Sequence, residues 1–156
     1  MTRHLFRAEL VETVRKAEGR TLPQLLRDNA REFGDRIGLK SKRAGIWHGR
    51  SWAWMLQEVR LHARGLAALG LSRGEVLAFI SENVEEQYLL ELAALSIGAI
   101  AVSVYPDATA DELGYALSHS GAVMVIGEDQ EQVDKILACV EASSVRRIVY
   151  LNGRGL

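Results

Sequence analysis

The second half of the chain alternates short apolar runs with segments of helical spacing. The apolar runs, rich in Val, Ile and Ala, occupy residues 76–81, 99–104, 123–127 and 147–151. Strands that alternate with helices in this way run parallel and are joined by right-handed crossovers. Because these runs contain so few polar positions, we expect the strands to be buried on both faces. The pattern predicts an α/β fold with a doubly wound, mainly parallel sheet of βαβαβαβ order.

Helix-start signals precede the three helical segments. Each signal is a polar residue followed three positions later by Glu or Gln, which is the pattern of a capping box, where two exposed backbone N–H groups are satisfied reciprocally. The pairs are Asn83 with Glu86, Thr109 with Glu112, and Asp129 with Gln132. We therefore expect a helix to follow each of these three polar residues.

Residues 21–75 predict a helix, a hairpin and a long helix. Thr21 can cap the first helix, with Pro23 in its first turn and Gly34 at its end. Basic residues surround Ala44-Gly45 between residues 37 and 52, which indicates a hairpin. Ser51 is then placed to cap a long helix with one apolar stripe. Together with the parallel units of residues 76–156, these elements predict one incomplete domain.

Residues 1–20 form an amphipathic segment, with Phe6, Leu10 and Val14 at helical spacing. We expect it to dock on the protein itself, because acidic residues share its polar face. Peripheral contact with the inner face of a membrane is the alternative. Neither a secretory signal nor a transmembrane segment is expected, since residues 88–105 are interrupted by Glu91 and Gly98.

Composition narrows the class of protein. The 156 residues carry a formal net charge of −1, and 25% of them are charged. This excludes a disordered charged tail and argues against a nucleic-acid partner. Trp47, Trp52 and Trp54 near the basic hairpin could stack on a single strand, but the balance of charge favours a solvated hairpin whose tryptophans anchor the next helix. A single cysteine, Cys139, fits a reducing, cytoplasmic location.

The loops that follow the predicted strands are where a parallel sheet binds ligands. A phosphate site there needs glycines and free backbone N–H groups, whereas Glu82, Glu85 and Glu86 would repel phosphates. The four histidines lack the spacing of metal ligands, and Cys139 has no cationic neighbour to activate it. From the residues alone we expect no catalytic, cofactor-binding or metal constellation.

Several segments, in their order along the chain, carry a resemblance to a known family. They include residues 45–47, 63–71, 74–76 and 81–86, and the most specific are Gly98–Pro106 followed by Leu113–Ser120. From Thr21 to Leu151 the chain resembles the beginning of the AMP-dependent, adenylate-forming acyl-CoA synthetases. Within that superfamily it is most similar to the long-chain fatty-acid–CoA ligases.

The resemblance implies a partial N-terminal domain of a ligase that converts a carboxylic acid and Mg-ATP to an acyl-adenylate, and then to acyl-CoA and AMP. The implied cofactors are ATP, Mg and CoA, and the implied partners are a fatty acid and the rest of the ligase chain. The family's catalytic motifs match no stretch of residues 1–156, so the resemblance implies no catalytic, cofactor-binding or metal-binding residue in this chain. Tyr105 and Pro106, at the end of a strand, are the only expected substrate contacts, on a pocket rim.

Two hypotheses about the isolated chain follow. In the first it is the N-terminal fragment of such a ligase, inactive alone and without tight binding of ATP, Mg or CoA. Some relatives contact CoA phosphates with arginines after the third strand, where this chain has the acidic residues 128–131. In the second it is a stand-alone, non-catalytic α/β binding or interaction module. Open sheet edges would favour association with a second copy in the fragment hypothesis.

Overall fold

The computed structural model describes residues 11, 12, 14, 15 and 17–153. Of the predicted amphipathic segment, Phe6 and Leu10 lie outside the described residues, whereas Val14 is helical and exposed. The elements are α2 (Leu22–Phe33), β1 (Ile37–Arg43), β2 (Ile46–Ser51), α3 (Trp52–Ala68), β3 (Val76–Ile80), α4 (Glu85–Ser96), β4 (Ile100–Val104), α5 (Ala110–Ser120), β5 (Ala122–Gly127), α6 (Gln130–Cys139), the 3₁₀ helix η1 (Val140–Ala142) and β6 (Arg147–Tyr150).

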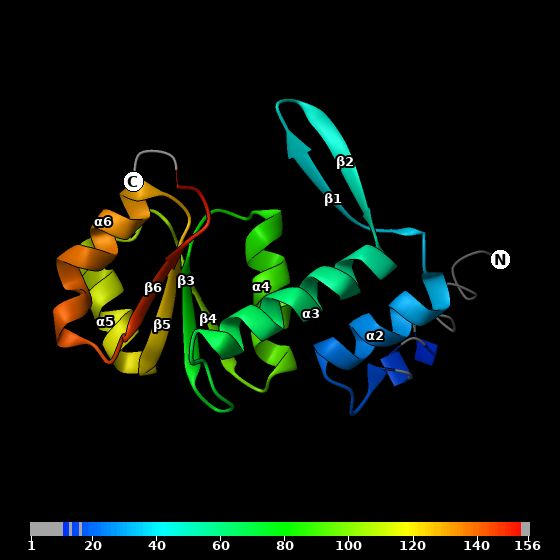
Figure 1. The fold of residues 1–156 in the computed structure, drawn as a ribbon, viewed down its shortest axis with the longest axis horizontal. Coiled ribbons are helices and arrows are strands. Elements are labelled where there is room, and N and C mark those ends of the chain that lie inside the picture. Colours follow the sequence, from blue (N-terminus) through cyan, green and yellow to red (C-terminus); the bar gives the residue numbers. More distant parts are fainter. Residues whose placement is uncertain (1–10, 13, 16, 154–156) are drawn as a thin grey trace.

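The larger sheet has the strand order β4-β3-β5-β6, and all its strands are parallel. The chain goes from β3 outward to β4, returns past β3 to β5 and continues to β6. Because the direction of winding reverses at β3, the connecting helices cover opposite faces. Helix α4, with α3 and α2 beside it, covers one face, and α5 and α6 cover the other (Figure 1). The predicted doubly wound parallel sheet is confirmed.

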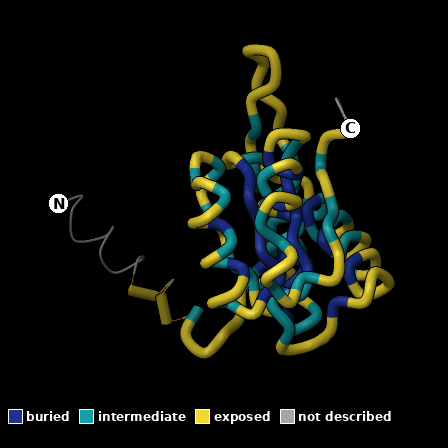
Figure 2. Tube along the Cα trace, turned by 90° about the vertical axis from the view of Figure 1, so that its left-hand side faces the viewer, coloured by how far each residue is buried: buried dark blue, intermediate teal, exposed yellow. Residues whose placement is uncertain are grey.

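The two central strands divide the apolar interior into two layers. Along β3, Leu77 and Phe79 belong to the cluster packed with α2, α3 and α4, whereas Ala78 and Ile80 belong to the cluster packed with α5 and α6. This alternation is the period of two of a strand whose two faces are both covered. Figure 2 shows the buried centre as dark blue strands.

The edge strands differ from the prediction. We expected all four strands to be buried on both faces, but Ile100 of β4 is 50% exposed and Tyr150 of β6 is also exposed. The reason is geometric, since an edge strand has a hydrogen-bonded neighbour on one side only and lies at the margin of the helices that cover the sheet.

Two of the predicted helix starts are confirmed and one is wrong. Thr109 and Glu112 form the full capping box. Asp129 caps α6 by accepting a hydrogen bond from the backbone N–H of Gln132 at 3.2 Å, but the predicted return bond is missing, because Gln132 Oε1 is buried without a hydrogen-bond partner among the described residues. Asn83 does not cap a helix, because α4 begins at Glu85 with Val84 in the cap position and no side-chain cap. Thr21 caps α2 and Ser51 caps α3, as predicted.

The hairpin of β1 and β2 is antiparallel and projects away from the start of α3 (Figure 1). Ala44 and Gly45 form its turn with φ angles of 48° and 81°, which suits the right-handed twist of the two strands. At its base, the Trp52 ring lies against Gly38 so closely that a Cβ atom there would be 2.7 Å from the ring. Gly38 is therefore required for the contact between hairpin and helix.

Candidate functional site

The loops that follow β3, β4 and β5 meet at the carboxyl edge of the sheet, as predicted. They border a cavity of about 520 Å³. Tyr105 and Pro106 line it, and Tyr105 is 82% exposed on its outer side. The other lining residues are Glu82, Asp107, Glu128, Asp129, Glu131 and Gln132.

Carboxylates dominate this cavity. The cation that reaches it is Lys135, whose Nζ donates to the carbonyl oxygen of Pro106 at 2.6 Å and lies 3.0 Å from Glu131 Oε1. An anionic ligand would therefore meet five carboxylates and one ammonium group already engaged by two oxygens. The electrostatics favour a neutral or cationic group over a phosphate.

At the crevice between β3 and β5, a carboxylate of the protein itself accepts a backbone hydrogen bond. In open α/β sheets this reversal point is where phosphates accept hydrogen bonds from backbone N–H groups. Here the N–H of Glu82 donates to Glu128 Oε2 at 2.7 Å, so the donor is already used. That backbone N–H is therefore not free to meet a phosphate. Among the described residues, no group of three or more His, Cys, Asp or Glu side chains is placed to hold a metal ion.

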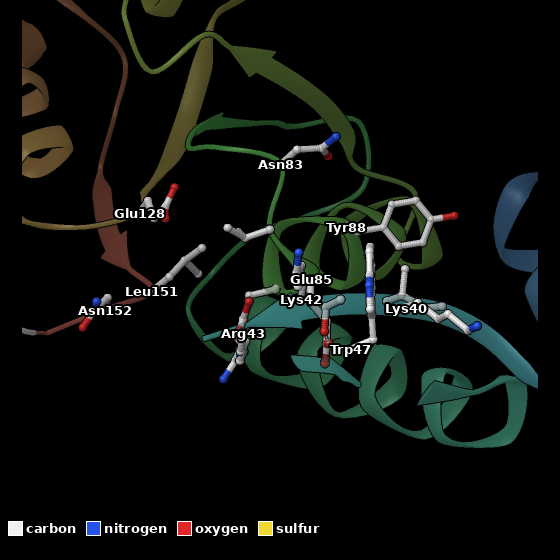
Figure 3. A pocket seen from close by; sticks show the side chains of 14 residues that line it. Lys40, Lys42, Arg43, Trp47, Asn83, Glu85, Tyr88, Glu128, Leu151 and Asn152 are labelled. Atoms are coloured by element: carbon white, nitrogen blue, oxygen red, sulfur yellow. Dashed lines mark hydrogen bonds and ion pairs between the residues drawn. The ribbon is translucent and has the colours of Figure 1, made fainter. Parts of the chain in front are cut away.

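A second hollow, of about 850 Å³, lies between the hairpin and the carboxyl edge of the sheet (Figure 3). We call it the hairpin groove. One wall is residues 39–43 with Trp47, another is the start of α4, and Leu151 and Asn152 form the third side. The sequence did not predict this groove, because its walls come from three distant parts of the chain.

Ionic contacts join the hairpin to the start of α4. Glu85 is only 8% exposed. Its Oε1 accepts a hydrogen bond from Arg50 Nε at 2.8 Å, and its Oε2 accepts one from the Ser41 hydroxyl. Arg43 donates to Glu86 in the same way. From the sequence, Glu85 and Glu86 were expected to repel phosphates and Glu86 to complete a capping box, and their partners on the hairpin were not predicted.

The surroundings of Glu85 favour its charged form. Burial by itself would raise the pKa of this carboxyl group. The hydrogen bonds from Ser41 and Arg50, together with the positive charges of Arg50 and Arg43, outweigh burial and lower the pKa below its ordinary value. Glu85 is therefore an ionised, hydrogen-bonded group at neutral pH rather than a general acid.

The three tryptophans have different roles. Trp52 and Trp54 pack against the apolar core, as expected, and the Arg50 guanidinium lies 4.4 Å from the Trp54 ring centre. Trp47 does not anchor the helix, because it lies far out on β2 and is 64% exposed, with Lys42 Nζ 5.8 Å from its ring centre. For Trp47 the expected anchoring role is wrong.

The remaining candidate residues lie apart from both hollows. His119 is in the last turn of α5, as expected, and stacks on Tyr115 with 5.4 Å between ring centres. Cys139 is half-buried, and burial, with a smaller effect of Asp111, raises the pKa of its thiol. A thiol with a raised pKa is a weak nucleophile at neutral pH.

Comparison with known proteins decides the family. Residues 26–155 match the family of AMP-binding enzymes. The chain belongs to this family. A long-chain-fatty-acid–CoA ligase of Xenopus laevis, ACSBG2, is 29% identical over 117 residues, which make up 75% of this chain and 16% of that protein. The crystal structure of the N-terminal domain of FACL13 from Mycobacterium tuberculosis is similar in fold, with a TM-score of 0.72 at 23% identity, covering 84% of this chain and 34% of that one.

Two further similarities concern fold and length. A crystal structure of a long-chain-fatty-acid–CoA ligase from Archaeoglobus fulgidus has a TM-score of 0.76 at 16% identity, covering 87% of this chain and 28% of that one. Rv1549, an uncharacterised protein of Mycobacterium tuberculosis (strain ATCC 25618 / H37Rv), is 34% identical over 103 residues, 66% of this chain and 57% of that protein. The chain of 156 residues thus covers only part of the length of each of these relatives. Among the described residues, no helix is both long and apolar enough to cross a membrane.

Proposed function

We propose that this chain is the N-terminal part of a long-chain fatty-acid–CoA ligase and that it supplies scaffold and a pocket wall rather than chemistry. The observation that carries the proposal lies at the carboxyl edge of the sheet. There the backbone N–H of Glu82 already donates a hydrogen bond to the Glu128 carboxylate. The family match supports a ligase. The hydrogen bond from the Glu82 N–H to Glu128, between the ends of β3 and β5, supports a role without phosphate binding. ATP, Mg and CoA would then be held by the rest of the ligase.

Tyr105 and Pro106 are proposed as the rim of the substrate pocket. The exposed Tyr105 ring offers an apolar face beside a cavity of about 520 Å³ that is lined mainly by carboxylates, and this suits an uncharged polar portion of a substrate better than a phosphate. We also propose that the protein acts in the cytoplasm, without tight membrane association, and that its open sheet edges are covered by the remainder of the ligase.

The test is ATP–pyrophosphate exchange on the purified chain with Mg and a series of fatty acids. We expect exchange no faster than in a blank without protein. Exchange above the blank, lost when the protein is heat-denatured, would overturn the proposal. A full-length bacterial long-chain fatty-acid–CoA ligase assayed in parallel shows that the reagents support exchange.

A stand-alone, non-catalytic α/β module is the second candidate. The observation that favours it is the short relative Rv1549, of which the 103 matched residues make up 57%. Reading the source gene separates the two functions. An open reading frame that continues in phase past residue 156 into a Ser/Thr/Gly-rich loop supports the ligase fragment, and a stop codon directly after residue 156 supports the module.

A further inference from the structure

The outer part of the hairpin lacks an apolar anchor. No residue between 40 and 48 belongs to either apolar cluster, and Ile46 and Trp47 are exposed. Figure 2 shows this hairpin as a mostly exposed loop that projects beyond the buried centre. A two-stranded hairpin is marginally stable alone in water. Its position over α4 must therefore come from other contacts.

The base of the hairpin is held firmly. Leu39 packs against the core beneath α3, and the Trp52 ring covers the backbone at Gly38. The backbone N–H of Trp52 donates to the carbonyl oxygen of Arg36 at 3.1 Å. These contacts fix one end of the hairpin, and residues 40–48 extend beyond it.

Charged side chains at the start of α4 bind the hairpin. Ser41 and Arg50 donate to the buried Glu85, and Arg43 donates to Glu86 nearer the turn. Ser41 and Arg43 are two positions apart on one strand, so their side chains point to the same face. Charge-assisted hydrogen bonds of this kind are stronger than neutral ones. They replace the apolar packing that the outer hairpin lacks.

We propose that the outer hairpin, residues 40–48, is a hinged flap that Glu85 and Glu86 latch over the hairpin groove. Its hinge is the base at Gly38 and Trp52, and its released state widens the groove towards Leu151 and Asn152. The proposal rests on the contacts of this chain and does not depend on the proposed ligase function.

The test is hydrogen–deuterium exchange, read by mass spectrometry on peptides from residues 40–48 and from β3. In E85Q the hairpin loses its charge-assisted hydrogen bonds to α4, and a released two-stranded hairpin is only marginally stable, so its own ladder opens. Exchange of the hairpin should therefore accelerate about tenfold or more. The matched control is I136A, which destabilises the whole fold from the opposite face of the sheet, where Ile136 is fully buried. A flap that opens by itself predicts that I136A accelerates exchange in β3 and leaves the hairpin unchanged within about twofold.

Two results would overturn the proposal. If the exchange rate of residues 40–48 is the same in E85Q as in the unmodified chain, Glu85 does not hold the hairpin in place. Hairpin exchange that rises as much in I136A as in E85Q shows that the hairpin opens only when the whole domain unfolds. Should E85Q fail to fold, E86Q replaces it, since the Glu86 side chain is 42% exposed, and a smaller acceleration in the same peptides is then expected.

Discussion

Neighbouring residues of β3 pack into different cores, so substitutions at both should destabilise the fold strongly. Phe79 and Ile80 are fully buried on opposite faces of the sheet. Truncation of a buried Phe to Ala costs about 3–5 kcal/mol, and of a buried Ile about 2–5 kcal/mol. Domains of this size are stable by about 5–15 kcal/mol. Each of F79A and I80A should therefore remove a large part of the free energy of unfolding.

Equilibrium unfolding in urea, followed by far-UV circular dichroism, measures these losses. The control is I100A on the edge strand β4, where Ile100 is 50% exposed; we expect a loss below about 1 kcal/mol. A sheet covered on one face only would tolerate either F79A or I80A. A loss below about 1 kcal/mol for one of them would refute the doubly covered sheet.

Two further predictions concern polar groups. Because the folded pKa of Glu85 lies below its ordinary value of 4.5, its ionised form stabilises the protein above that pH, and the contribution is lost as the pH falls through the folded pKa. E85Q should thus lose about 1.5–3 kcal/mol at pH 7 and progressively less as the pH falls below 4.5 and through the folded pKa, measured by urea unfolding over a series of acidic pH values; a loss that stays the same at every pH would contradict this. T109A removes the capping box of α5 and should cost about 1 kcal/mol, whereas S118A, at an exposed position of the same helix, should cost less; equal losses would count against the cap.

The parts of the fold that depend on neighbouring residues could be predicted from the sequence. Thr109 with Glu112, the turn at Ala44-Gly45 and the alternation along β3 all follow local rules of capping, turn geometry and periodicity. The meeting of the loops after β3, β4 and β5 also follows, because parallel strands place their carboxyl ends at one edge of the sheet.

The contacts between distant segments could not be predicted in this way. Glu85 bonds to Ser41 and Arg50, which are 44 and 35 positions away, and no periodicity relates them. The helix start was also wrong, since α4 begins at Glu85 with Val84 in the cap position, which places Asn83 one residue before the cap, and Glu86 bonds instead to the distant Arg43. The exposure of Trp47 likewise depends on where the hairpin projects.

The proposed function requires that these residues provide no binding site for the phosphates of a nucleotide. Titration of the chain with Mg-ATP, followed by isothermal calorimetry and by ³¹P NMR, tests it most directly. We predict no saturable heat and no shift of the β- or γ-phosphate resonances up to millimolar ATP. Tight, stoichiometric binding of ATP, with phosphate resonances shifted by the protein, would contradict the claim.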